Sequence, residues 1–182
     1  MWRILVVDDE DNILSAIRRG LKQSGRDESL PPLQVEAFTS PQAALARSRE
    51  GVAYDLVLSD YRMPEMSGIE FLRSFRELQP DAVRIILSGY ADLDAVIHAI
   101  NEVEIYRFLS KPWNDHELQQ TIRQAIEHRN LLLENRRLAD LVRVQQGKLT
   151  RQQLELRRLE EETPGITRVR WGPDGEVLLE EF

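Results

Sequence analysis

The first two thirds of the chain alternate short apolar runs with segments in which apolar residues recur at helical spacing. Ile13, Leu14, Ile17 and Leu21, for example, repeat with the helical period. The apolar runs occupy residues 4–7, 35–38, 56–58, 83–87 and 105–109. Such alternation is typical of a parallel sheet covered by helices on both faces. The pattern predicts an α/β fold with a doubly wound, five-stranded parallel sheet over residues 1–126.

Polar residues at the expected helix starts support this alternation of strands and helices. Ser67 is followed three residues later by Glu70, and Asn114 by Glu117. This spacing allows the two side chains to cap a helix N-terminus reciprocally. The pattern predicts five helices in all, the fourth of them around residues 91–101.

The segment 127–162 differs in composition, because Gln, Arg, Glu and Leu dominate it and no proline occurs before Pro164. Its apolar residues follow a heptad repeat, which predicts a parallel two-stranded coiled coil that continues the fifth helix. The predicted seam consists of Leu131, Asn135, Leu138, Val142, Leu149, Leu156 and Leu159. Asn135 suits a polar pair that fixes the register, whereas Gly147 weakens the middle of the seam. We therefore expect a homodimer through this tail.

The last segment, 163–182, places two short apolar stretches around Gly172-Pro173-Asp174-Gly175, which predicts a small β-hairpin. Neither a helix-turn-helix pattern nor an effector-sized stretch follows residue 126. We therefore expect the output of the chain to run through protein contact.

The net charge of −7 and the pI of about 5.1 provide no strong positive field, so direct binding of nucleic acid is not expected. The chain has no cysteine, which excludes disulfides and thiolate metal sites. No apolar stretch has the length of a membrane span or of a signal peptide. We expect a cytoplasmic protein that does not contact membranes.

Three carboxylates follow predicted strands. Asp8 and Asp9 come directly after the first strand, and Asp60 comes after the third. The carboxyl ends of parallel strands meet at one edge of a sheet, where ligands bind, so these side chains should lie together. Crowded carboxylates favour a hard cation such as Mg²⁺. The alternative is that the acidic stretch simply stabilises the N-terminus of the first helix.

Two further polar residues end strands at the same predicted edge, Ser88 after the fourth run and Lys111 after the fifth. A carboxylate attacks phosphorus readily only when the charge of the phosphoryl oxygens is neutralised. A metal ion, an ammonium group and a hydroxyl donor provide this neutralisation. Taken singly, Lys111 reads as a surface lysine and Ser88 as a turn former; together with Asp60 they indicate an aspartyl-phosphate site.

Four motifs resemble the receiver domain of two-component response regulators. They are Leu5-Val6-Val7-Asp8-Asp9, the stretch from Leu58 to Gly68, Leu87-Ser88-Gly89 and Phe108-Leu109-Ser110-Lys111-Pro112-Trp113. The resemblance covers residues 1–126 and implies a flavodoxin-like receiver with strand order 2-1-3-4-5. It also implies a sensor histidine kinase or phosphotransfer protein as the phosphoryl donor, with catalysis limited to self-phosphorylation and autodephosphorylation.

The resemblance assigns roles residue by residue. It implies that Asp60 accepts the phosphoryl group and that Asp8, Asp9, Asp60 and the backbone carbonyl of Arg62 bind Mg²⁺. Lys111 would pair with the acyl phosphate, Ser88 would hold a phosphoryl oxygen, and Pro112 would follow a cis peptide bond. Phe108 stands at the place of the switch aromatic, although plain core packing explains an aromatic residue on a strand equally well.

Other functions remain open at this point. In a phosphorelay intermediate or phosphate sink, Asp60 would pass its group on without a conformational output. A phosphohydrolase of the haloacid-dehalogenase type would carry a second acidic residue two places after the nucleophile, where this chain has Arg62. A phosphate-free scaffold would not require Asp8, Asp60 and Lys111 together.

Overall fold

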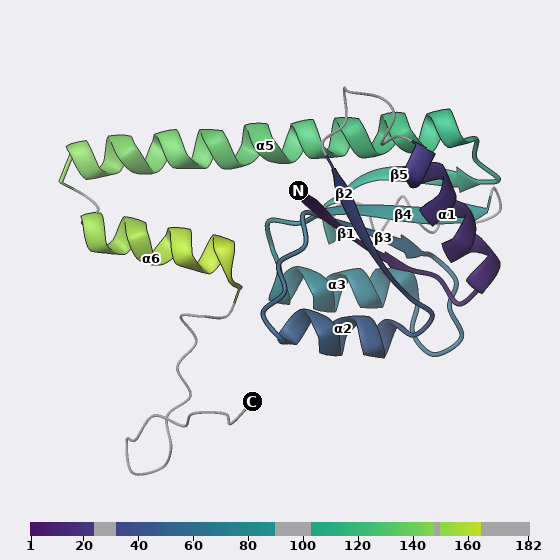
Figure 1. The fold of residues 1–182 in the computed structure, drawn as a ribbon. Helices are drawn as coiled ribbons and strands as arrows, with labels where there is room; N and C mark the ends of the chain where they lie inside the picture. The colour runs from purple at the N-terminus through teal and green to yellow at the C-terminus, as the bar shows by residue number, and fades with distance from the viewer. Residues whose placement is uncertain (24–31, 90–102, 148–149, 165–182) are drawn as a thin grey trace, which may run out of the picture.

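A parallel sheet organises the computed structural model, which describes residues 1–23, 32–89, 103–147 and 150–164 (Figure 1). The strands are β1 (Trp2–Val7), β2 (Leu33–Phe38), β3 (Leu56–Asp60), β4 (Val83–Gly89) and β5 (Ile105–Lys111). Their order is β2-β1-β3-β4-β5, and every neighbouring pair is parallel. The doubly wound fold and the strand order are confirmed. Each of the five apolar runs lies within a strand.

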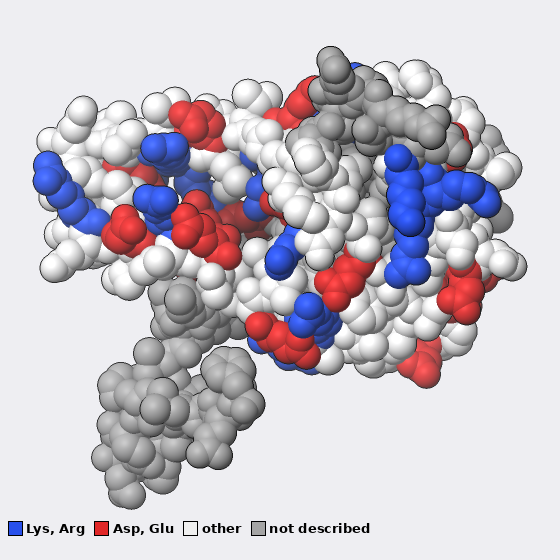
Figure 2. All heavy atoms as spheres, viewed as in Figure 1, with Lys and Arg blue, Asp and Glu red and all other residues white. Residues whose placement is uncertain are grey.

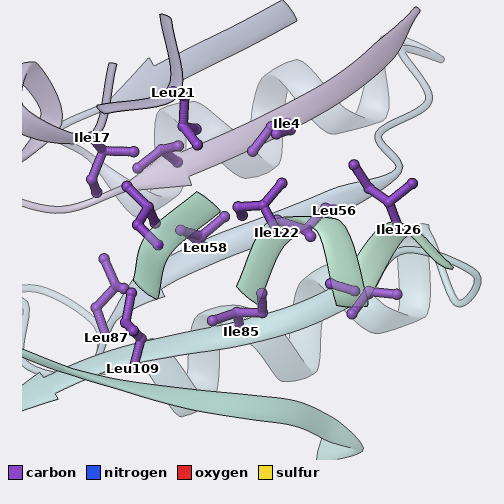
Figure 3. Packing of buried hydrophobic residues seen from close by; sticks show 14 of the residues in the cluster. Ile4, Ile17, Leu21, Leu56, Leu58, Ile85, Leu87, Leu109, Ile122 and Ile126 are labelled. Carbon is purple, nitrogen blue, oxygen red and sulfur yellow. The ribbon is translucent and has the colours of Figure 1, made fainter. Parts of the chain in front are cut away.

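Helices cover both faces of the sheet. On one face lie α1 (Asp11–Gln23) and the first turns of α5 (Asp115–Gln145); on the other lie α2 (Pro41–Arg49) and α3 (Gly68–Leu78) (Figure 1). Figure 3 shows Ile17 and Leu21 of α1 and Ile122 of α5 pointing toward the sheet. The helix predicted around residues 91–101 lies outside the described residues.

The strand β1 shows why its apolar run is continuous. Ile4 and Val6 belong to the core beneath α1 and α5, whereas Leu5 and Val7 belong to the core beneath α2 and α3. All four side chains are fully buried. Because side chains alternate across a strand, a strand that is covered on both faces requires an apolar residue at every position.

The predicted helix caps are present. The Ser67 hydroxyl accepts a hydrogen bond from the Glu70 backbone N–H at 3.3 Å, and the Glu70 carboxylate accepts one from the Ser67 backbone N–H at 2.9 Å. Asn114 caps α5 by accepting from the backbone N–H of Glu117 at 2.8 Å. These bonds satisfy donors that the first turn of a helix leaves without intrahelical partners.

The tail differs from the sequence prediction, which has one helix continue to residue 162. In the structure α5 ends at Gln145 and a second helix, α6 (Arg151–Glu162), begins after a turn. Gly147 has φ of 68°, a conformation that favours glycine, and Thr150 forms a capping box that starts α6. Leu149 and residues 165–182, including most of the predicted hairpin, lie outside the described residues. Within the described part of the chain, no helix is long and apolar enough to cross a membrane.

Candidate functional site

Side chains from the first, third and fifth strands meet at the carboxyl edge of the sheet. Asp8 follows β1, Asp60 ends β3 and Lys111 ends β5. The Lys111 Nζ lies 2.7 Å from Asp8 Oδ2 and 2.7 Å from Asp60 Oδ1. The structure therefore brings together three of the residues that the sequence places at this edge.

Burial sets the electrostatics of these groups. Asp8 is fully buried and Asp60 nearly so, while a fifth of the Lys111 side chain is exposed. Burial is the largest influence on Asp8 and raises its pKa above the usual value, although hydrogen bonds from Lys111 and the Glu10 backbone N–H oppose this rise. Burial lowers the pKa of Lys111, but its hydrogen bonds to Asp60 and Asp8 outweigh that effect and leave the pKa raised. The site thus contains a charged ammonium between two carboxylates.

The backbone around Asp60 is held closely. The Arg62 backbone N–H donates to Asp60 Oδ2 at 3.1 Å, and the Ser59 hydroxyl donates to the Asp60 carbonyl oxygen at 3.0 Å. A Cβ atom on Gly68, the first residue of α3, would lie only 2.0 Å from that carbonyl oxygen. Only glycine fits there without a backbone shift. No role for Gly68 was predicted from the sequence; the signal for it was its position directly after the helix cap Ser67.

Ser88 lies on the strand between the two that carry Asp60 and Lys111. In the sheet register Asp60 pairs with Leu87, and Lys111 pairs with Gly89, so Ser88 falls between these two pairs. Ser88 is buried, and its hydroxyl donates to the Gly89 carbonyl oxygen at 3.2 Å. Its place at the edge agrees with the sequence prediction.

The two aromatic residues of β5 face opposite sides of the sheet. Phe108 is partly buried against the core beneath α2 and α3. Tyr106 packs against the core beneath α1 and α5, and its ring stacks on His128 of α5 with 4.7 Å between ring centroids. Phe108 therefore lies on the α3 side of the strand that ends in Lys111.

The oxygen atoms at this edge match the preference of Mg²⁺. Asp8 and Asp60 supply two nearly buried carboxylates, and Asp9 is exposed beside them. In the described ranges, no three acidic or histidine side chains form a ready metal-binding cluster. Mg²⁺ keeps several waters and accepts carbonyl oxygen, so two carboxylates, the Arg62 carbonyl and water are a suitable donor set. The residues present therefore fit the ion.

The peptide bond between Lys111 and Pro112 is cis, as the resemblance implies. A strand-end lysine that is followed by a cis proline thus accompanies the carboxylates of Asp8 and Asp60 at the edge of a doubly wound sheet.

Comparison with known proteins identifies the family of the chain. Residues 4–123 match the family model of the response regulator receiver domain. The chain belongs to the family of response-regulator receiver domains. The matched range, residues 4–123, contains Asp8, Asp60, Ser88 and Lys111.

Individual relatives are similar over a wider range. The hydrogenase transcriptional regulatory protein HoxA of Cupriavidus necator is 38% identical over 154 residues, covering 85% of this chain and 27% of that protein. The C4-dicarboxylate transport transcriptional regulatory protein DctD of Rhizobium meliloti is 33% identical over 138 residues, 74% of this chain and 27% of that protein. This chain thus spans about a quarter of the length of these curated relatives.

A solved structure shares the fold. The response regulator receiver domain protein from Clostridium thermocellum superposes with a TM-score of 0.64 at 33% identity, over 72% of this chain and 99% of that one. The match to HoxA is longer than the stretch matched by the family model, so similarity continues beyond the receiver into the tail.

Proposed function

We propose that this chain is the phosphoryl-accepting switch of a two-component phosphorelay. Asp60 takes the group from a sensor histidine kinase or phosphotransfer protein in a Mg²⁺-dependent reaction. The observation that carries the proposal is the Lys111 ammonium placed 2.7 Å from both Asp8 and Asp60. An ammonium in this position neutralises charge beside the carboxylate that attacks phosphorus.

The transfer forms one bond and breaks another. An Asp60 carboxylate oxygen attacks phosphorus of a phosphohistidine, the P–N bond breaks, and its electron pair leaves with the donor imidazole. Lys111 pairs with the resulting acyl phosphate, while the Arg62 backbone N–H keeps the second Asp60 oxygen oriented at 3.1 Å. Mg²⁺, held by Asp8, Asp9, Asp60 and the Arg62 carbonyl oxygen, supplies further neutralisation of phosphoryl charge when it is bound.

Phosphorylation adds about −1.5 to −2 charges and three acceptor oxygens at Asp60. In the proposed response, Ser88 moves to hold one of these oxygens and Phe108 turns inward, which alters the surface around β4 and β5. Support comes from the buried position of Ser88 between Asp60 and Lys111 in register, and from the partial burial of Phe108. A phosphorelay intermediate without conformational output is the alternative.

The output is proposed to run through protein contact. HoxA and DctD are named transcriptional regulatory proteins, which supports a place for this chain in transcriptional control. The tail carries nearly balanced charges, so it does not resemble a helix that binds DNA by itself. We further propose that the tail pairs with a second copy of the chain.

Labelling by a small phosphodonor tests the acceptor. With acetyl phosphate and Mg²⁺, we expect Asp60→Asn to reduce incorporation of phosphate to background. Asp81→Asn, shortly before the start of β4 and so at the opposite edge of the sheet, should label like the parent and serves as the control. Lys111→Ala should label weakly and lose signalling, because the phosphoryl charge is no longer paired. Equal labelling of Asp60→Asn and the parent would rule out the assignment.

A further inference from the structure

The tail carries apolar side chains that the receiver does not cover. On α5, Leu131, Leu138 and Val142 are 66%, 51% and 49% exposed. On α6, Leu156 and Leu159 are 53% and 38% exposed. These five residues are the apolar members of the predicted heptad seam that the structure describes. Their exposure shows that the intrachain packing of the tail does not use the seam.

The tail instead folds back on itself. Figure 1 shows α6 running back beneath α5 toward the receiver. Arg157 of α6 donates to both carboxylate oxygens of Asp140 on α5, at 2.8 and 2.9 Å, and Arg143 donates to the same carboxylate at 2.9 Å. We call this arrangement the tail hairpin. Its main polar tie is the Asp140–Arg157 pair.

The tail hairpin is loosely packed. No residue of α6 is buried, and a cavity of about 680 Å³ lies between the two helices. Its lining mixes apolar residues such as Leu133, Leu141 and Leu154 with charged ones. Figure 2 likewise shows acidic and basic side chains interspersed over this part of the surface. The apolar burial that normally stabilises packed helices is therefore small here.

The chain reverses at a residue that permits two conformations. Gly147 has φ of 68°, and a Cβ atom at this position would meet nothing within 4 Å. A larger residue would therefore be disfavoured in the turn by the backbone angle and not by a steric clash. Glycine also adopts helical angles, at a cost relative to alanine. The same sequence can therefore form the turn or continue the helix.

We propose that the tail hairpin is the closed form of a conformational switch. In the open form Gly147 becomes helical, α5 and α6 join, and the exposed seam residues of both helices pair as one stripe with a second copy of this chain. This inference rests on the proposed pairing of the tail and adds the conformational change that the pairing requires. The Asp140–Arg157 pair, which ties the two helices together, opposes opening.

Two features favour a second copy as the partner. The heptad register continues from α5 into α6 without a shift, so a straight tail presents one stripe that an identical helix can match residue for residue. Asn135 within the stripe would face Asn135 of the other copy, a pairing that selects two identical helices in register.

The closed form cannot present this stripe. The α5 part of the seam has three exposed apolar residues over about two heptads, and Leu156 and Leu159 lie on a helix that runs in the opposite direction. Sustained pairing generally needs three to four heptads. A partner helix that follows the α5 part could not reach the α6 part until the turn at Gly147 opens.

The association constant of the full chain tests the proposal. We expect Gly147→Ala to strengthen dimerisation about tenfold or more in sedimentation equilibrium, because alanine disfavours the positive φ and favours the helix in both copies. Arg157→Gln should also strengthen dimerisation, since it removes the main tie. The matched control is Arg158→Gln. Among the residues that the structure describes, Arg158 forms its ion pair within α6, with Glu162 at 3.1 Å. Adding Leu138→Asp to Gly147→Ala should return the chain to the monomer.

A distance measurement follows the opening directly. The chain has no cysteine, so Arg137→Cys and Arg158→Cys, both beside the cavity of the tail hairpin, accept spin labels uniquely. We expect a short label distance in the parent background and about 30 Å between backbone positions after opening, given 1.5 Å of rise per residue. Unchanged association and distance in Gly147→Ala would overturn the proposal. Labelling of Asp60, measured on the same samples, tests the phosphoryl site independently.

Discussion

Glu36 is the centre of a small polar cluster on the α2 side of the sheet. Its carboxylate accepts a hydrogen bond from the Tyr54 hydroxyl at 2.7 Å and one from Arg47 Nε at 2.9 Å. Burial alone would raise the pKa of Glu36, but these hydrogen bonds and the charges of Arg47 and Arg3 together lower it. Burial and the hydrogen bond to Glu36 raise the pKa of Tyr54. The cluster ties β2, α2 and the segment before β3.

This cluster predicts a pH dependence of stability. A carboxylate whose pKa is lower in the folded state stabilises the fold above its unfolded pKa of about 4.3 and loses this effect as the pH falls through the folded pKa. We expect Glu36→Gln to lower the unfolding free energy by about 1 kcal/mol near pH 7, with the difference from the parent shrinking below about pH 4. Urea denaturation at a series of pH values measures this difference in unfolding free energy. Glu50→Gln, which removes an exposed carboxylate beside the same arginine, is the control; a difference that grows in acid would contradict the prediction.

At the scale of residues, the sequence predicts those site residues whose place depends only on their position along a strand. Asp8 directly follows a strand, Asp60 and Lys111 each end one, and a parallel sheet brings such ends together. The roles of Gly68 and Asp140 could not be predicted in this way. Gly68 matters because the Asp60 carbonyl oxygen lies against it, and Asp140 because a distant arginine reaches it; both depend on the folded arrangement.

At the scale of elements, two equivalent capping boxes start helices of very different burial. Ser67 begins α3, which buries Phe71, Leu72 and Phe75, whereas Thr150 begins α6, which buries nothing. We expect Ser67→Ala to lower the free energy of receiver unfolding by about 1 kcal/mol, because α3 unfolds with the core. Thr150→Ala should leave that free energy unchanged and reduce only the helical content of the tail. Chemical denaturation, followed by far-UV circular dichroism and by tryptophan fluorescence, separates the two effects.

The periodicity of apolar residues predicted the strands because burial on both faces forces continuous apolar runs. The same method failed at the tail, where the heptad repeat runs through Gly147 into α6. A repeat reports which side chains share a stripe, and it does not report whether one glycine adopts a positive φ. The turn depends on that one backbone angle and on a tie between Asp140 and Arg157, residues 17 positions apart.

At the scale of the whole molecule, α5 serves two parts of the protein. Its first turns bury Leu118, Ile122 and Ile126 in the core, and beyond them Arg129 and Arg136 form ion pairs with Asp55 and Asp81 of the receiver. The helix passes from the core into the tail without a break. The position of the tail is thereby linked to the receiver through a rigid element.

This division predicts a large effect on stability for one truncation in α5 and almost none for another. Ile122→Ala should lower the unfolding free energy by about 2–5 kcal/mol, because it leaves a cavity beneath α1 and α5. Leu138→Ala, at an exposed position of the seam, should change it by less than about 0.5 kcal/mol at concentrations where the chain is monomeric. Thermal and urea unfolding of the two variants measure the contrast, and similar losses for both would show that the tail unfolds together with the receiver.

The position of Lys111 on the last strand has a consequence for synthesis of the chain on the ribosome. Asp8 and Asp60 emerge early, but the cation that balances them is translated about fifty residues after Asp60 and takes its place only when β5 joins the sheet edge. Until then a nascent chain holds two carboxylates without their counter-ion. We therefore expect the cluster of Asp8, Asp60 and Lys111 to be completed only when β5 joins the sheet, late in the folding of the chain.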